Sequence, residues 1–318
     1  MSRSIVVIVT LVVILTIAFL PQDGGETRPV ANGNLIPATT TMVTAWDIPK
    51  DPLTDSSLIS SPNAEEIRWG FRLFTNTHEE TPHFSPNKLS CNHCHLNGGQ
   101  REKAMPLVGV AGVFPEYNKR AGRQFSLEDR IVGCFMRSQN AAERESMRMT
   151  NMAAGGEEEG FPSTVSKEVR ALAAYITWIS EEYPAGAELP WRGQNSIHAN
   201  NVIPLDKLDP KRGEALFIEK CSSCHGEDGQ GQPIGDKKPG PLWGPHSWND
   251  GAGAARIYTL AGIIRYAMPY LDPGSLTDEE AQQISAFINS KPRPKYPFKA
   301  EDYRTEPLPP DAVYYLQK

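Results

Sequence analysis

Two segments of the chain carry apolar residues at intervals of three and four positions, the spacing that predicts an amphipathic helix. The first segment begins after Asn63, which suits a helix cap, with Glu66 three positions later. The second begins at Asp209-Pro210, a pair that suits the cap and the first position of a helix. The apolar positions are Ile67, Gly70, Phe71 and Phe74 in the first segment and Gly213, Leu216 and Phe217 in the second.

A second amphipathic helix is expected further along each half of the chain. One starts at about Ser166, and the other starts at Thr277, which forms a capping box with Glu280. Because the same order of elements occurs twice, the pattern predicts two similar, mainly α-helical domains. The apolar positions of the closing helices are Leu172, Tyr175, Ile176 and Ile179 in one half and Ile284, Phe287 and Ile288 in the other.

The composition agrees with two domains and excludes one class of partner. A chain of 318 residues has room for about two compact domains. The 26 glycines and 27 prolines predict long loops between the helices. The net charge is −6 and no basic stripe is visible, so nucleic acid is not expected as a partner.

The N-terminal stretch has the form of an export signal. Residues 5–20 are apolar except for two threonines, and Arg3 precedes them. This run is longer than a typical signal core but shorter than a full membrane span, and no Ala-x-Ala-like cleavage site follows it. We therefore expect residues 1–20 to be a signal peptide or a membrane anchor, with residues 5–20 as the anchoring segment.

Four of the five cysteines fall into two Cys-x-x-Cys-His motifs. In such a motif both sulfurs form thioethers with a haem, and the histidine becomes the proximal ligand of the iron. Neither a zinc site nor a disulfide requires a histidine directly after each cysteine pair. The sequence therefore predicts two covalently bound haem c groups, and we expect His93, inside the first motif, to face solvent. The motifs are Cys91-Asn92-His93-Cys94-His95 and Cys221-Ser222-Ser223-Cys224-His225.

The motifs and the repeated helices give the expected domain organisation. The fold class is mainly α, with two tandem class I cytochrome c-like domains and extensive loops. Covalent haem attachment takes place outside the bacterial cytoplasm, which agrees with the export signal and predicts a periplasmic location. The expected segments are a signal or anchor (1–20), a lead-in linker (21–60), the N-terminal domain (61–183), a linker (184–208), the C-terminal domain (209–298) and a proline-rich tail (299–318).

Each iron also needs a candidate ligand for its sixth position. In the second half, Met268 precedes a proline and lies 43 residues after His225, where small cytochromes place a distal methionine that raises the potential. In the first half, Cys134 lies 39 residues after His95. An exported protein rarely keeps a thiol without a use, so we expect Cys134 to be the distal ligand or a redox-active thiol. Met105 is a rival, but it lies only ten residues after His95.

The residues around Cys134 predict a helix with a reactive face. After a cap at Ser126, the residues Arg130, Cys134 and Ser138 recur every four positions and therefore share one face. Residues 119–144 carry a local excess of three positive charges. Arginine forks bind oxyanions, and nearby cations hold a cysteine as thiolate. A solvated basic helix at the surface is the alternative interpretation.

Segments in both halves, spread over roughly residues 60–297, resemble the dihaem thiosulfate dehydrogenase family. The resemblance implies that Cys134 is the distal thiolate of the active-site haem, with Arg120, Arg130 and Ser138 around a bound anion. It also implies that the haem with Met268 hands electrons out. Where this family often has lysine or asparagine before the distal methionine, this chain has Ala267, so ligand exchange through a lysine is not expected. The resembling segments are Leu89–His95, Phe114–Arg123, Leu127–Ser138, Pro241–Pro245 and Gly251–Gly253, and the one around Cys134 is the most specific.

The resemblance implies oxidation of two thiosulfate ions to tetrathionate, or the reverse reduction, with a soluble electron acceptor such as a cytochrome c or a high-potential iron-sulfur protein. Three other functions remain open. A transferase that attaches thiosulfate to a carrier protein's cysteine shares the thiolate-ligated haem but needs partner subunits. A plain electron carrier would use Cys134 only to tune the potential. A dihaem peroxidase has a similar size and two motifs, but no acid/base carboxylate is placed for its reaction.

Overall fold

The computed structural model describes residues 35–38, 40, 46–142 and 162–315. The expected signal or anchor at residues 1–20 lies outside the described residues. Within the described ranges, no helix is both long enough and apolar enough to cross a membrane.

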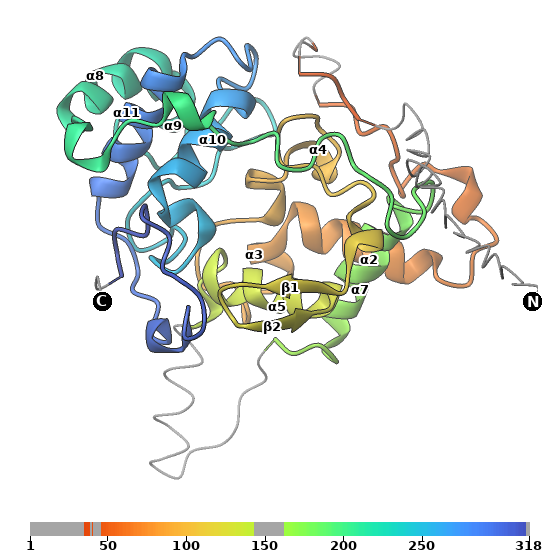
Figure 1. Ribbon diagram of the computed structural model, residues 1–318. Coiled ribbons are helices and arrows are strands. Elements are labelled where there is room, and N and C mark those ends of the chain that lie inside the picture. Colours follow the sequence, from red (N-terminus) through yellow and green to blue (C-terminus); the bar gives the residue numbers. More distant parts are fainter. Residues whose placement is uncertain (1–34, 39, 41–45, 143–161, 316–318) are drawn as a thin grey trace, which may run out of the picture.

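Two groups of helices, one from each half of the chain, lie side by side (Figure 1). The first half contains α2 (Ala64–Thr75), α3 (Thr77–Glu80), α4 (Leu96–Gly99), β1 (Glu116–Asn118), β2 (Arg123–Phe125), α5 (Leu127–Arg137) and α7 (Lys167–Trp178). The second half contains α8 (Pro210–Lys220), α9 (Ser222–His225), α10 (Ile257–Ala267) and α11 (Asp278–Ser290). Short 3-10 helices are η1 (Ser56–Leu58), η2 (Cys91–His93), η3 (Val110–Val113), η4 (Ala199–Asn201), η5 (Leu205–Lys207), η6 (Gly253–Ala255) and η7 (Lys299–Glu301).

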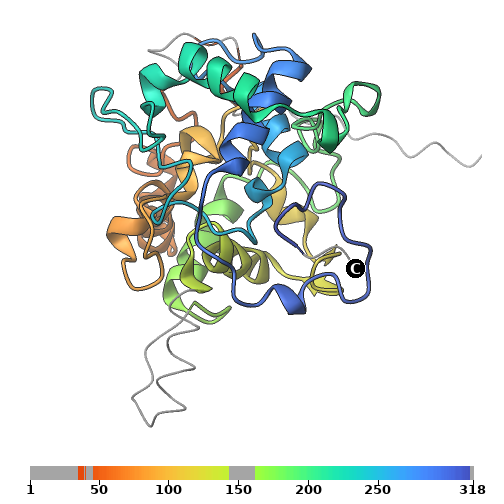
Figure 2. The ribbon, with the colours of Figure 1, turned by 90° about the vertical axis from the view of Figure 1, so that its left-hand side faces the viewer.

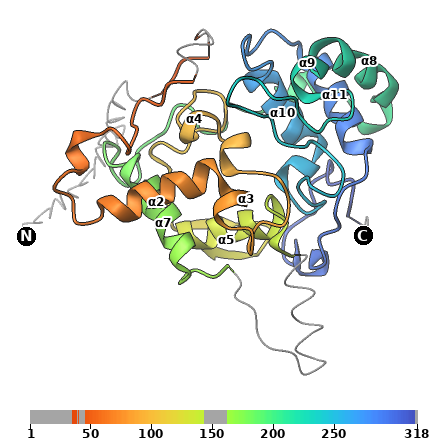
Figure 3. The same ribbon diagram turned by 180° about the vertical axis from the view of Figure 1, so that it is seen from behind.

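The frame of the first half is the close crossing of α2 and α7 (Figure 3). Gly70 allows this approach, because a Cβ atom there would lie 1.9 Å from the backbone oxygen of Ala171. One turn further along each helix, the rings of Phe74 and Tyr175 pack with centroids 5.6 Å apart. The crossing therefore ends in an aromatic contact that lies next to the first haem motif, where Phe74 is 6.4 Å from the His95 ring.

The second half repeats this frame with α8 and α11. A Cβ atom on Gly213 would lie 2.0 Å from the backbone oxygen of Gln283. One turn further along, the rings of Phe217 and Phe287 pack with centroids 5.4 Å apart. Phe217 lies 6.5 Å from the ring of His225. The repeat expected from the apolar spacing is thus present in three dimensions.

The helix starts follow the expected caps. Ser126 and Thr277 each form a complete capping box, with Asp129 and Glu280 respectively. The Asp209 side chain accepts a hydrogen bond of 2.9 Å from the amide of Lys211 at the start of α8. Asn63 occupies the cap position of α2, but its side chain makes no capping hydrogen bond.

A short antiparallel hairpin leads into α5. Strands β1 and β2 pair with Tyr117 opposite Gln124, and the turn between them carries Arg120. The hairpin therefore fixes the position of Arg120 just before the helix that carries Cys134.

The C-terminal segment runs back over the first half (Figure 2). We call residues 299–315 the C-terminal strap. The amide of Tyr303 donates a hydrogen bond of 2.8 Å to the carbonyl oxygen of Arg120. Asp302 accepts two hydrogen bonds, of 2.7 and 3.0 Å, from the guanidinium of Arg137 at the end of α5. The end of the chain thus packs against the helix that carries Cys134.

Candidate active site

The first motif presents the donor set of a haem c site. Nδ1 of His95 donates a hydrogen bond of 2.6 Å to the carbonyl oxygen of Met105. This bond fixes the tautomer and leaves the lone pair on Nε2, as is usual for a histidine that binds a metal. Met105, the alternative candidate for the sixth position of the first iron, therefore takes part in the site through its backbone carbonyl.

The motif thiols are free and largely removed from water. Burial raises the pKa of Cys91 to about 12 and that of Cys94 to about 11. Two free thiols three positions apart, followed by an imidazole with a fixed tautomer, fit the attachment of haem c.

The second motif has the same donor set, with the proximal histidine on α9. Burial lowers the pKa of His225 to about 4 and keeps the ring neutral, as metal ligation requires. Its Nδ1 atom is buried and has no hydrogen-bond partner among the described residues. Burial also raises the pKa of Cys221 to about 12. The residues of this motif fit haem c as well.

Helix α5 places Cys134 beside the first motif. Burial is the main cause that raises the pKa of Cys91 and of Cys94, and the charge of Cys134 raises both further. The opposite face of α5 anchors the helix, because Ile131 and Phe135 are buried in the core of the first half. The structure therefore brings the fifth cysteine within electrostatic reach of both motif thiols.

Arg130 lies on the same face of α5, one turn before Cys134, and it is exposed. Burial is the main cause that lowers the pKa of His95, and the charge of Arg130 lowers it further. Ser138 caps the end of α5, where its amide donates a hydrogen bond of 2.8 Å to the carbonyl oxygen of Cys134. Arg130 and Cys134 thus form a cationic, sulfur-bearing face next to the first motif.

Arg120 lies in a different environment from Arg130. Its Nη1 atom donates a hydrogen bond of 2.6 Å to the carbonyl oxygen of Gly251 in the second half. Its guanidinium also lies 5.7 Å from the ring of Tyr303 in the C-terminal strap. Of the residues expected around the anion, Arg120 is therefore held at the contact between the two halves and the strap.

Met268 directly follows α10 in extended conformation. It packs against a small apolar cluster in which Leu96 and Ala104 come from the first half. Two residues later, the carbonyl oxygen of Tyr270 accepts a hydrogen bond of 2.6 Å from the fully buried Arg101. The loop that carries Met268 is thus held against the first half, and its ligation of the second iron stays a prediction.

Comparisons with known proteins identify both halves. The model of the SoxA/TsdA cytochrome c domain matches residues 81–185, and the model of the cbb3-type cytochrome c oxidase subunit III matches residues 208–288. Thiosulfate dehydrogenase of Allochromatium vinosum is 36% identical over 240 residues, which cover 73% of this chain and 80% of that protein. Thiosulfate dehydrogenase of Psychrobacter arcticus is 33% identical over 274 residues, which cover 84% of this chain and 76% of that protein.

The chain belongs to the thiosulfate dehydrogenase family. A solved structure of the thiosulfate dehydrogenase TsdBA from Marichromatium purpuratum, in its as-isolated form, agrees with a TM-score of 0.65 and 32% sequence identity. The match covers 77% of this chain and 49% of that chain, so the protein spans about half the length of the solved relative. Family membership confirms the mainly α-helical fold with two cytochrome c domains. It also confirms the prediction of a haem c oxidoreductase.

One expectation about this thiosulfate dehydrogenase-family chain is wrong. His93 does not face solvent, because it lies half-buried between the two halves. Its Nδ1 atom accepts a hydrogen bond of 3.0 Å from the amide of Ser90, and its Nε2 atom donates one of 3.1 Å to the carbonyl oxygen of Lys238. Burial lowers the pKa of His93 to about 4. No local sequence signal indicates this contact, because its partner lies 145 residues away.

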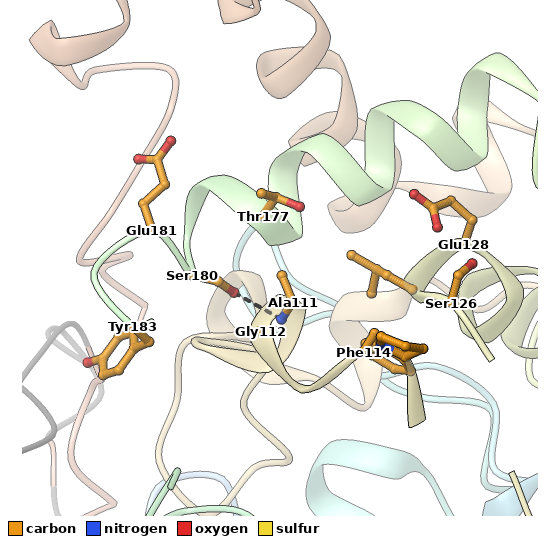
Figure 4. Close-up of a pocket in the computed structure, with 11 residues that line it drawn as sticks. Ala111, Gly112, Phe114, Ser126, Glu128, Thr177, Ser180, Glu181 and Tyr183 are labelled. Atoms are coloured by element: carbon orange, nitrogen blue, oxygen red, sulfur yellow. Dashed lines mark hydrogen bonds between the residues drawn. The ribbon is translucent and has the colours of Figure 1, made fainter. Parts of the chain in front are cut away.

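A surface cavity of about 630 Å³ lies elsewhere on the first half, between the start of α5 and the end of α7 (Figure 4). Its walls include Phe114, Glu128, Thr177 and Tyr183. Neither a motif residue nor Cys134 lines it. The cavity is therefore separate from the cysteine and arginine face described above.

Proposed function

We propose that this protein joins two thiosulfate ions to form tetrathionate and releases two electrons, with one haem in each domain. The observation that carries the proposal is that Cys134 lies within electrostatic reach of both thiols of the first motif, on the face of α5 that also carries Arg130. Relatives of this chain that are named thiosulfate dehydrogenases support the choice of substrate.

The residues that would hold the haems are the two motifs, with Cys134 and Met268 as the distal ligands. When bound, the haems supply one-electron acceptors. Thiolate ligation in the first site would give the lower reduction potential, and thioether ligation in the second site would give the higher one. Electrons would then leave through the second half to an external acceptor, such as a soluble cytochrome c or a high-potential iron-sulfur protein.

Cys134 would carry the sulfur chemistry. Its thiolate and the outer sulfur of one thiosulfate form a sulfur–sulfur bond, with loss of two electrons, to give an S-thiosulfonate on the cysteine. A second thiosulfate then attacks, through its own outer sulfur, the sulfur atom of the adduct that is bonded to Cys134. The bond to Cys134 breaks, the thiolate is restored, and tetrathionate leaves, as in an ordinary thiol exchange.

Arg130 would hold the anions while they react. Two thiosulfate dianions repel each other, so positive charge is needed most where they meet. The Arg130 side chain is exposed and lies one helical turn from Cys134, which suits it to this contact. Arg120 and Ser138 would support the pocket, Arg120 from the hairpin turn and Ser138 from the end of α5.

We also propose that the protein works in the periplasm, either free or attached to the inner membrane through residues 5–20. Residues 5–20 have the apolar sequence of an export signal. Fractionation of cells that express the whole chain, with mass analysis of the mature N-terminus, would test this location.

The decisive experiment is an assay of the isolated holoprotein with thiosulfate and ferricyanide, which measures electron release and tetrathionate formation. Wild-type protein should turn over with thiosulfate as the only substrate. The Cys134→Ser variant should lose at least about 100-fold in kcat, because the nucleophile that carries the adduct is missing. Low-temperature electron paramagnetic resonance should show a thiolate-ligated haem in the wild type and none in the variant.

Two controls make this result interpretable. Haem content per chain should be the same in both proteins, since Cys134 lies outside both attachment motifs. A variant of the neighbouring surface residue, Glu128→Gln, should keep full turnover. Full activity of Cys134→Ser with both haems attached would rule out the proposed chemistry, and no turnover in the wild type would leave an electron carrier or a transferase that needs partner subunits.

A further inference from the structure

The segment that leads into the first motif is docked into the second half. We call residues 87–93 the seam segment. Leu89 is only 4% exposed and belongs to the apolar core of the second half. The amide of Lys88 donates a hydrogen bond of 3.0 Å to the carbonyl oxygen of His246. The first motif is therefore in direct contact with the domain that carries the second motif.

His93 is the last residue of the seam segment, and both of its ring nitrogens are used. Nδ1 accepts from the amide of Ser90, so the proton must be on Nε2, which donates to the carbonyl oxygen of Lys238. The first bond closes a local turn inside the motif. The second crosses from the first half to the second, as does the bond from the amide of Lys88 to the carbonyl oxygen of His246.

The second half is shaped to receive this ring. Gly240 is buried, and a Cβ atom there would lie 2.3 Å from Cδ2 of Leu89 and 2.8 Å from Nδ1 of His93. Any side chain at position 240 would push the loop away from the seam segment. The absence of a side chain at Gly240 therefore allows His93 and Leu89 to dock closely.

His93 also links the first motif to the loop that follows the second motif. Its backbone is bonded directly to Cys94 of the first motif, while its ring donates to the carbonyl oxygen of Lys238. In the second motif the matching position is Ser223, which is exposed. The contact is thus a feature of the first motif alone.

We propose that His93 is the positioning residue that holds the two haem-binding halves in register for electron transfer between them. The proposal rests on the occupation of both motifs by haem, which is part of the proposed function, but it does not rest on thiosulfate as the substrate. The bond from Nε2 to the carbonyl oxygen of Lys238 ties the first motif to the loop at residues 238–240. Without it, this loop would be held against the seam segment by the packing of Leu89 alone.

The test measures internal electron transfer in the holoprotein without thiosulfate. One haem is reduced by a light flash, and the spectra then follow the transfer to the other haem. His93→Ala should slow this transfer by roughly five- to tenfold, the scale expected from the loss of one hydrogen bond. The matched control is Ser223→Ala, the same position in the second motif, which should keep the wild-type rate.

Two further variants separate the contact from a general disturbance of the motif. In the His93→Gln variant the side-chain amide of the glutamine can donate a hydrogen bond to the same carbonyl oxygen. This variant should therefore keep most of the wild-type rate of electron transfer. Gly240→Ala leaves both motifs intact but should slow the transfer as His93→Ala does. In all variants the reduction potentials of the two haems should stay at the wild-type values, because none of these substitutions alters an axial ligand.

A wild-type transfer rate in His93→Ala, with both haems attached, would overturn the proposal. Equal losses in His93→Gln and His93→Ala would overturn it too, since the bond to Lys238 would then not be what His93 supplies. The result is independent of the substrate: a protein that does not oxidise thiosulfate still gives a measurable transfer rate, so failure of the proposed function would not be mistaken for failure of this inference.

Discussion

The two halves share one frame and differ in the helix that precedes the candidate distal ligand. In both, a glycine lets two helices cross, and an aromatic pair one turn further along packs beside the proximal histidine. In the first half, α5 buries only Leu127, Ile131 and Phe135 and carries Cys134 within the helix. In the second half, α10 buries most of its residues, and Met268 follows its last turn.

In the proposed function, this difference decides which half carries the sulfur chemistry. The frame places a phenylalanine ring at a similar distance from each proximal histidine, 6.4 Å in the first half and 6.5 Å in the second, so it does not distinguish a reactive site from an electron-transfer site. The polar face of α5 carries the half-buried Cys134 and the exposed Arg130, whereas α10 leads into a loop that packs against the first half. In the proposed function, the contrast between the two sites comes from this face of α5.

The largest expected effect comes from breaking the shared frame itself. Gly70→Ala should destabilise the first half and Gly213→Ala the second by about 3 kcal/mol or more, because each new Cβ atom would meet a backbone oxygen at about 2 Å. Thermal unfolding of the holoproteins checks this. A control at Gly193, where a Cβ atom meets nothing within 4 Å, tests whether the effect comes from the crossing. Since φ is +77° there, a small strain effect is expected even in the control.

The second prediction concerns the strap, which contacts both of the helices compared. Its Asp302 pairs with Arg137 at the end of α5, and its Asp311 accepts a hydrogen bond of 3.0 Å from the amide of Tyr258 at the start of α10. Asp302→Ala should reduce the free energy of unfolding by about 3 kcal/mol, because the guanidinium of Arg137 loses its nearly buried carboxylate. The neighbouring Glu301→Ala variant removes a carboxylate from an exposed pair with Arg304 and should change stability by less than about 1 kcal/mol. Chemical denaturation of both variants would reveal whether the difference exists.

The third prediction separates the arginines of the two helices. Arg130→Gln should lower kcat/KM for thiosulfate by about ten- to 100-fold, as expected for the loss of a hydrogen bond to a charged group. Arg265 on α10 already pairs with Asp278 at 2.7 Å, so Arg265→Gln should leave kcat/KM unchanged. Steady-state kinetics would contradict the assignment of Arg130 if the two variants behaved alike.

The smallest effect is expected at the start of α5, which has a capping box that α10 lacks. Asp129→Ala should cost about 1 kcal/mol of stability, the usual value of a helix cap. Hydrogen bonding to Arg123 is the main cause that lowers the pKa of Asp129. A lowered carboxyl pKa gives stability that is present above the unfolded-state pKa of about 4 and is lost as the pH falls below it. The wild type and Asp129→Ala should therefore converge in stability in acid, as measured by denaturation at several pH values.

Much of the fold could be predicted because its signals are local. The start of α5 at Ser126 and the start of α11 at Thr277 follow from capping boxes four residues long. The spacing that places Arg130 and Cys134 on one face is likewise contained within one helix. The sequence alone also indicated that the first half holds the thiol and the second half the methionine. Their role as iron ligands stays a prediction.

The contacts between the halves could not be predicted in this way. Arg137 and Asp302 are 165 residues apart, and His93 and Lys238 are 145 residues apart. No periodicity or cap links such distant positions. A histidine between two motif cysteines is expected to be exposed, because the sequence does not show that the second half packs against it. The β1–β2 hairpin was also not expected, because its strands are only three residues long.

The C-terminal strap has a consequence for how the protein is made. The contacts of Arg120 with Tyr303 and of Arg137 with Asp302 join residues that are 183 and 165 positions apart. Helix α5 therefore gains these contacts only when residues 302 and 303 have reached the compartment in which the chain folds. A chain shortened to end before residue 299 would leave the first half without them.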